Sequence, residues 1–416
     1  MHHRIRLFLI HFISTATVIV MGVAVFGCAP SLQKRQDAAA NALDALKESR
    51  FDYASESARS VLADDGENPF AAVIAAITLY KTTMHNLFLD GQTVVVGAAA
   101  TNRFNDRYFR SIVEEADRHL AEVARLLDVA AQEEAFAMEF CLACLEVDWN
   151  QNGEVDDRDR VLLEVELDEA EQQIPKGDPR RRPTFRFDHG DVVWAQTFIS
   201  FQRAFLNLVS AWDLSPIAEL LRSGDDRTYR FRLVYPDRVA LARSLILRGL
   251  SLSEQTRQAL LAETDDEREW LPNPRQKDHP MPLPVDDALY ETWGLVLSDM
   301  EKLVRSEEGL SVSRIFHLID EETGAAQVRG YLDIGRMLTH ADDIVIRPEL
   351  LEDDIEALED GEPDEAEAAL ENIFGECYVK EMKPSGLPDR LHRMRDEVVT
   401  GKESFERKLR YLLWVN

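Results

Sequence analysis

Oxygen-bearing side chains gather in one short segment near the middle of the chain. Five of them stand at short intervals around Gly153: Asp148, Asn150, Asn152, Asp156 and Asp159. Carboxylate and amide oxygens are the ligands that hard divalent cations prefer, and Ca²⁺ takes roughly six to eight of them. The residue types therefore predict a binding site for one hard cation.

This segment resembles the calcium loop of EF-hand proteins over residues 148–159. The resemblance implies that one Ca²⁺ is held by the backbone carbonyl of Glu154 and by five side chains, those of Asp148, Asn150, Asn152, Asp156 and Asp159. Asp159 stands where the family usually carries glutamate, and its shorter carboxylate weakens the expected affinity and admits Mg²⁺ as a competitor. The alternative is an Asx-rich turn between two helices that holds no metal.

Helices are expected on both sides of the loop, over residues 132–147 and 157–173, so that calcium would clamp one against the other. Cys141 and Cys144 have CxxC spacing inside the first of these expected helices, which favours two buried core thiols. A zinc site would need two more ligands. The redox state of Cys141, Cys144 and Cys377 stays open.

Other residues that could do chemistry form weaker patterns. Acidic residues begin a similar spacing at Asp360, but Glu365 replaces the glycine, and a solvated loop with a helix over 364–374 is expected instead. His189 lies between Asp188 and Asp191 and indicates a helix cap. The common linear motifs of hydrolases and nucleotide-binding enzymes are not present in the sequence.

The N-terminus carries Arg4 and Arg6 before an apolar stretch that ends Val25-Phe26-Gly27-Cys28. This stretch resembles a bacterial lipoprotein signal peptide with its lipobox, which implies cleavage after residue 27, lipidation (diacylglycerol and palmitate) of Cys28, and a tether over 28–35. Ala29 follows the cysteine, a pattern that resembles sorting to the outer membrane of a Gram-negative bacterium. The alternatives are an uncleaved membrane anchor, because the apolar run is nearly long enough to span a bilayer, and an ordinary signal peptide.

Over most of the remaining chain, apolar residues recur at helical spacing. This pattern predicts a mainly α protein of helical hairpins or a bundle, with a few short C-terminal strands at 315–319 and 326–332. We expect helical domains at 36–175 and 186–306 and a C-terminal region at 307–416, with a loop or strand at 87–101. Residues 51–69 resemble one tetratricopeptide repeat, and a plain antiparallel helix pair is the alternative.

The net charge of the chain further limits the classes of function that the sequence allows. The chain of 416 residues has 47 Lys+Arg and 76 Asp+Glu, a net charge of −29, which argues against nucleic-acid binding. The sequence therefore favours a lipid-anchored, non-enzymatic envelope protein with one structural Ca²⁺, serving as a scaffold or interaction module for an envelope partner. The alternative is an envelope hydrolase with carboxylates as acid and base.

The lipobox leads to a direct test. Cys28→Ala should leave the uncleaved precursor, because the sulfur that receives the lipid is gone. The wild-type protein should partition into detergent and carry a lipidated N-terminus by mass spectrometry. An unmodified Cys28 in the mature protein would contradict the assignment.

Overall fold

The computed structural model describes residues 31–101, 103–149, 153–156, 159, 164–165, 172–220, 228–279, 285–319, 327–346 and 348–397. The fold is mainly α, as predicted. The longer helices are α2 (Leu32–Lys47), α3 (Phe51–Asp64), α4 (Pro69–Thr101), α5 (Asp106–Ala130), α7 (His189–Val209), α9 (Pro236–Ala262) and α10 (Asp287–Val304). The C-terminal part adds α11 (Val312–Ile319), α12 (Ile334–Thr339), α13 (Pro348–Asp360), α14 (Pro363–Phe374) and α15 (Leu387–Glu397).

Short elements connect these helices. The single-turn helices are α8 (Ile217–Leu220), η1 (Leu142–Cys144), η2 (Pro179–Arg181) and η4 (Gly375–Cys377). The strands are β1 (Ala137–Phe140), β2 (Phe185–Asp188), β3 (Tyr229–Phe231), β4 (Leu310–Ser311), β5 (Tyr331–Leu332), β6 (Ile344–Ile346) and β7 (Tyr378–Val379). They pair antiparallel as β1–β2, β3–β6 and β4–β5–β7, so each sheet is too small to form a layer of its own.

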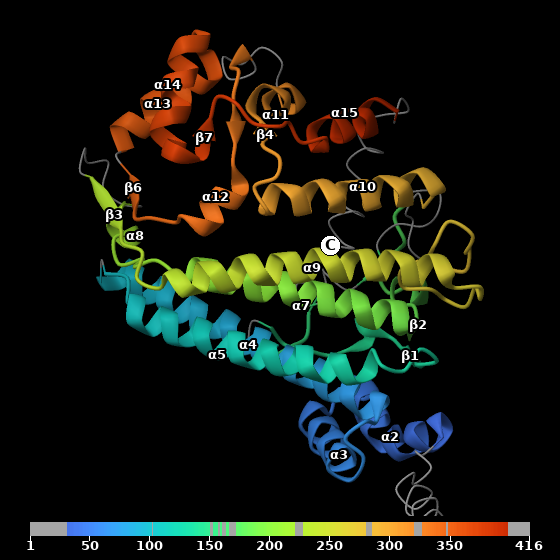
Figure 1. The fold of residues 1–416 in the computed structure, drawn as a ribbon. Helices are drawn as coiled ribbons and strands as arrows, with labels where there is room; N and C mark the ends of the chain where they lie inside the picture. Colours follow the sequence, from blue (N-terminus) through green and yellow to red (C-terminus); the bar gives the residue numbers. More distant parts are fainter. Residues whose placement is uncertain are drawn as a thin grey trace, which may run out of the picture.

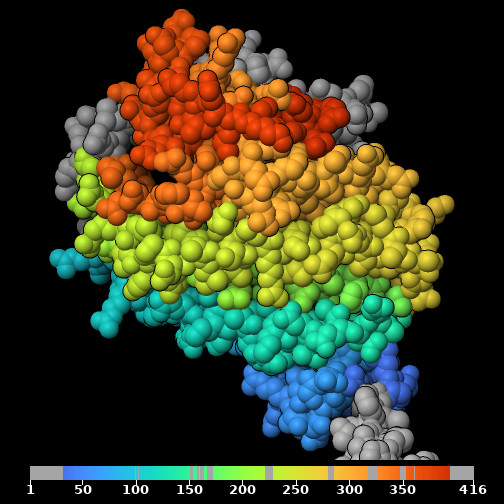
Figure 2. Space-filling view, viewed as in Figure 1, coloured from blue at the N-terminus to red at the C-terminus, as the bar shows by residue number. Residues whose placement is uncertain are grey.

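The long helices are stacked in chain order. Figure 1 shows α5, α7, α9 and α10 lying roughly side by side, with α2 and α3 at one end of the molecule and the C-terminal helices at the other. The space-filling view shows the same order as successive bands of colour (Figure 2). Because α7 lies between α5 and α9, it is the central helix that its apolar sequence predicts.

The largest core lies between α2–α5, β1 and α7. A second core joins β2, α9, α10 and the loop after α9, around Trp293 and Trp270. The contact of α2 and α3 with the start of α4 is rich in buried alanines, which lets the helix backbones approach closely: Ala39, Ala42, Ala45, Ala54, Ala58 and Ala71. Among the residues that the structure describes, no helix is both long enough and apolar enough to cross a membrane.

Three predicted elements before α7 are wrong. Residues 87–101 continue α4 rather than forming a loop or strand, because the helix packs along α5. Residues 132–147 contain β1 and η1 instead of a helix, since Phe136, Met138 and Phe140 alternate into the core. Glu164 and Val165 are not helical, so residues 157–173 do not form a continuous helix.

The ends of the chain also differ from expectation. Ser31 caps α2 through its side chain, so the helix begins at Leu32, inside the predicted tether. Residues 315–319 belong to α11 and not to a hairpin strand. β5, which lies at the end of the strand expected at 326–332, pairs with β4 and β7 and not with residues 315–319. The thiols expected in the core form the disulfide Cys141–Cys144, and the Cys144 end is exposed.

Two glycines should respond in opposite ways to alanine. A Cβ on Gly335 in α12 would lie 2.5 Å from the backbone nitrogen of Ser306 and 2.7 Å from the Val304 carbonyl oxygen, so Gly335→Ala should destabilise the fold by about 1–3 kcal/mol. A Cβ on Gly91 in α4 meets nothing within 4 Å, so Gly91→Ala should stabilise by up to ~1 kcal/mol. Urea unfolding of both variants checks the signs, and equal effects would contradict the close approach of α12 to the end of α10.

Candidate metal centres

The predicted calcium loop is closed by its own hydrogen bonds. The Gly153 N–H donates to Asp148 Oδ2 at 2.9 Å, and Gly153 has φ +89°, a conformation that favours glycine. Asp159 accepts from the Trp149 N–H on Oδ1 and from the Asp156 N–H on Oδ2, both at 2.9 Å. The carboxylate of Asp159 is buried, at 6% exposure. The two ends of the loop are therefore joined through one carboxylate.

The structure describes only part of the predicted ligand set. Asp148, Glu154, Asp156 and Asp159 lie within the described residues, whereas Asn150, Asn152 and the lipidation site Cys28 lie outside them. Among the four, the Asp156 N–H donates to Asp159, Asp148 accepts from Gly153, and Glu154 is exposed. The carboxylates of these described residues do not lie close enough together to form a metal-sized group. The predicted entry helix is replaced by η1 and extended chain, so the helix–loop–helix frame is absent on the N-terminal side.

The loop lies against the N-terminal helices. The rings of Trp149 and His85 in α4 are 6.1 Å apart, and the Glu146 N–H donates to Ser49 Oγ in the turn between α2 and α3. Burial lowers the pKa of His85, as does the nearby charge of Lys81, while Asp148 raises it. The segment that enters the loop thus bridges α4 and the α2–α3 turn.

The structure brings together a second group of carboxylate oxygens, which the sequence pattern does not predict. Four carboxylates, which we call the acidic cluster, meet at the start of α7 and the end of α9: Asp188, Asp191, Glu263 and Glu269. Figure 1 shows β2, the start of α7 and the end of α9 at the same side of the molecule. Oxygens of Asp188, Glu263 and Glu269 lie within 4.8 Å of one another. Asp188 and Asp191 form the capping box of α7, so the predicted helix cap is confirmed.

Backbone contacts bring the distant members of the acidic cluster together. Glu269 is bridged to Arg186 in β2, and the Arg186 N–H donates to the Arg268 carbonyl at 3.0 Å. Glu263 caps the C-terminus of α9, and its Oε1 would lie 2.7 Å from a Cβ on Gly190. Glycine at position 190 therefore lets the Glu263 carboxylate approach the first turn of α7. In the sequence, the glycine between the capping residues Asp188 and Asp191 could indicate a close approach of another group to this turn. It does not show that the group comes from the end of α9.

Burial and mutual repulsion perturb these carboxyls. Burial, with the neighbouring carboxylates, raises the pKa of Glu263 to about 9 and that of Glu269 to about 7. Burial also raises the pKa of Asp188, and that of Asp191 lies well above its usual range. The neighbouring strand and loop carry Phe185, Phe187 and Trp270, whose rings pack against one another. Such a site favours either bound protons or a bound cation over bare negative charge.

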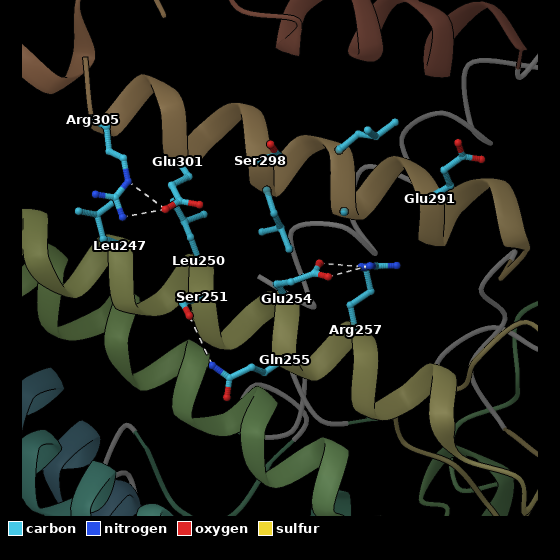
Figure 3. A pocket seen from close by; sticks show the side chains of 13 residues that line it. Leu247, Leu250, Ser251, Glu254, Gln255, Arg257, Glu291, Ser298, Glu301 and Arg305 are labelled. Carbon is cyan, nitrogen blue, oxygen red and sulfur yellow. Dashed lines mark hydrogen bonds and ion pairs between the residues drawn. The ribbon is translucent and has the colours of Figure 1, made fainter. Parts of the chain in front are cut away.

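A groove of about 650 Å³ lies elsewhere, between α9 and α10. Figure 3 shows Glu254 held by Arg257 on α9 and Glu301 held by Arg305 on α10. The hydrogen bonds from Arg257 lower the pKa of Glu254, which keeps it ionised. Two of the three carboxylates that line the groove are therefore paired with arginine, Glu291 is the third, and the converging carboxylates of the acidic cluster are not among the lining residues.

The raised pKa values predict how stability depends on pH without divalent cations. A carboxyl with a folded-state pKa above its unfolded value of 4.5 binds protons more tightly in the folded protein, so its stabilising effect is lost as the pH rises. Stability should fall from pH 4.5 toward 7 through Glu269 and on toward 9 through Glu263, with Asp188, Asp191, Asp265 and Arg186 as the charged neighbours. The slope is at most ~1.4 kcal/mol per pH unit for each carboxyl, and water access to Glu263 reduces it.

Chemical denaturation in EDTA at several pH values measures this slope. Glu263→Gln should flatten it, because the amide does not titrate, whereas Glu301→Gln in the groove should leave it unchanged. A wild-type protein whose stability rises steadily from pH 5 to 9 would contradict the raised pKa values.

No family model, curated protein or solved structure matches this chain. What the chain does must therefore be inferred from its own residues. Among the described residues, the carboxylates close enough together to share a metal ion are those of Asp188, Glu263 and Glu269, whereas the calcium-type loop is identified by its sequence spacing.

Proposed function

We propose that this chain is a lipid-anchored protein of the bacterial cell envelope, on the outer membrane, whose helical body binds one structural Ca²⁺ through residues 148–159 and serves as a non-enzymatic scaffold. One observation carries the calcium assignment. The carboxylate of Asp159 joins the N–H groups of Trp149 and Asp156, while Gly153 turns back to Asp148. Hydrogen bonds within this short loop thus hold the chain in a turn that carries three of the predicted carboxylate ligands, and a bound cation would draw their oxygens together.

The envelope assignment draws on the sequence before residue 31 and on one feature of the body. The lipobox ending at Cys28 is the anchor in this proposal. The disulfide Cys141–Cys144 agrees with an oxidising compartment outside the cytoplasm, where such bonds persist. With α2 beginning at Leu32, a lipidated Cys28 would hold the helical body close to the membrane surface.

The observed fold gives the proposed calcium ion a different role from the one expected from the sequence. The proposed ion would not clamp two helices, since residues 132–147 contain β1 and η1. It would instead fix the extended segment before the loop, where Val147 is buried in the largest core and Trp149 lies beside His85. Calcium would then strengthen the contact between the loop and α4. A site in the extracellular affinity range, about 10⁻⁴ to 10⁻³ M, would suit a permanent clamp rather than a switch.

The scaffold role is favoured over the hydrolase by the groove between α9 and α10. Two of its three carboxylates, Glu254 and Glu301, are paired with arginines, and the lowered pKa of Glu254 does not suit a general acid. A groove that alternates paired charges with leucines offers contacts to a protein partner. Co-purification from envelope membranes is the way to identify such a partner.

Calcium removal should weaken the fold measurably. Because an ion that binds only the folded state stabilises it by RT ln(1 + [L]/Kd), tenfold saturation contributes about 1.4 kcal/mol. EDTA should therefore lower the Tm modestly, and added Ca²⁺ should restore it. Asp148→Ala should remove the part of this dependence that comes from the loop.

Asp360→Ala is the matched control, because it removes an aspartate from the acidic segment whose spacing lacks the loop glycine. It should leave the calcium dependence unchanged. Calorimetric titration of chelator-treated protein provides the direct measurement. If the wild type and Asp148→Ala bind Ca²⁺ with the same stoichiometry at millimolar concentration, the loop is not a calcium site.

A further inference from the structure

We propose that the acidic cluster of Asp188, Asp191, Glu263 and Glu269 is a second divalent-cation site, suited to a hard ion of the Ca²⁺ type and independent of the loop at residues 148–159. It goes beyond the proposed function, which needs one ion only. The site would join the start of the central helix α7 to the end of α9.

The spacing of the oxygens fits a single ion. Ligand atoms of Asp188, Glu263 and Glu269 lie within 4.8 Å of one another. Two oxygens on opposite sides of a Ca²⁺ ion are about 4.6–5.2 Å apart, because each Ca–O distance is about 2.3–2.6 Å. The three carboxylates are therefore close enough for one ion to contact all of them after a small shift of their side chains.

A buried oxygen without a partner points to the same place. Asp191 is 4% exposed, and its Oδ1 has no hydrogen-bond partner, whereas its Oδ2 accepts from the Asp188 N–H at 3.2 Å. Its charge is repelled by those of Asp188, Glu263 and Glu269, so a cation among these three would also relieve the repulsion on Asp191. An unsatisfied buried carboxylate oxygen is costly, and a cation would satisfy it.

Hydrogen bonds already orient each ligand. Asp188 Oδ1 accepts from the Gly190 N–H at 2.9 Å, and Glu269 Oε1 accepts from the Glu267 N–H at 2.8 Å. Gln276 Nε2 donates to Glu263 Oε2 at 3.3 Å. At least one oxygen of each of these carboxylates is thus held by the protein, which is how outer partners hold metal ligands in place.

The local charge balance also calls for a cation. Arg186 lies beside the acidic cluster, but its guanidinium is shared among Asp265 at 2.7 Å, Glu267 at 3.5 Å and Asp188 at 3.7 Å. The N-terminus of α7 adds only about half a positive charge. One divalent ion would offset much of the remaining negative charge, and the half-buried Glu263 gives it a side from which to enter.

The ligand type selects the ion. The acidic cluster supplies carboxylate oxygens alone, without a thiolate among them, which suits Ca²⁺, Mg²⁺ or Mn²⁺ rather than zinc or copper. Ca²⁺ tolerates irregular geometry and longer ligand distances than Mg²⁺ does. We therefore expect Ca²⁺ to bind more tightly here than Mg²⁺, with water completing the coordination.

The test uses the full chain carrying Asp148→Ala, so that the loop no longer contributes. Calorimetric titration with Ca²⁺ after chelator treatment should show one saturable site. Adding Glu263→Gln and Glu269→Gln should weaken it more than the ~100-fold that loss of an outer partner costs. Glu254→Gln, which changes another glutamate of α9, should leave the affinity unchanged.

Two further measurements distinguish a loss of ion binding from misfolding of the variants. Glutamine relieves the like-charge repulsion, so in EDTA the double glutamine variant should melt no lower than its parent, and with Ca²⁺ it should melt lower. Terbium luminescence excited through tryptophan should also persist in Asp148→Ala and vanish with the double variant, since Trp270 adjoins Glu269. No saturable binding in Asp148→Ala, or binding that survives the double substitution, would overturn the proposal.

Discussion

The start of α7 concentrates the strongest physical constraint in the molecule, because several carboxylates are buried where three elements meet. Asp188 ends β2 and caps α7, and Asp191 completes the capping box. Since α7 packs between α5 and α9, its position decides how the two largest cores meet. Any occupant that neutralises this charge therefore stabilises the central stack and not merely one loop.

The sequence predicts a helix correctly where apolar residues recur at helical spacing and a capping residue or proline marks the helix end. Pro236 begins α9, and Asp286 caps α10 through the N–H of Leu289, and both residue types are common at helix starts. At 132–147 the spacing of apolar residues alone predicted a helix, and this prediction is wrong. The alternation of Phe136, Met138 and Phe140 belongs to a strand. In the second half of α4, Gly91 and Gly97 suggested a loop, but packing along α5 overrides their low helix propensity.

The two carboxylate sites differ in how far they can be predicted. The loop at 148–159 is local in sequence, so its spacing and Gly153 could be recognised before any fold was known. The acidic cluster joins Asp188 with Glu263 and Glu269, which are far apart in the chain and meet through the bridge between Arg186 and Glu269. Their proximity depends on tertiary packing, which one sequence does not reveal.

The alanine-lined contact of α2 and α3 with α4 has a mechanical consequence. α4 has 33 residues and is therefore about 50 Å long, and the two shorter helices grip its first part. Small side chains such as Ala42 and Ala58 bring α2 and α3 close to the backbone of α4, and the Asn68 side chain donates to the Arg35 carbonyl across the contact. Because α4 also packs along α5, a pull on residue 31 would pass through α2 into α4 and be shared by the stacked helices.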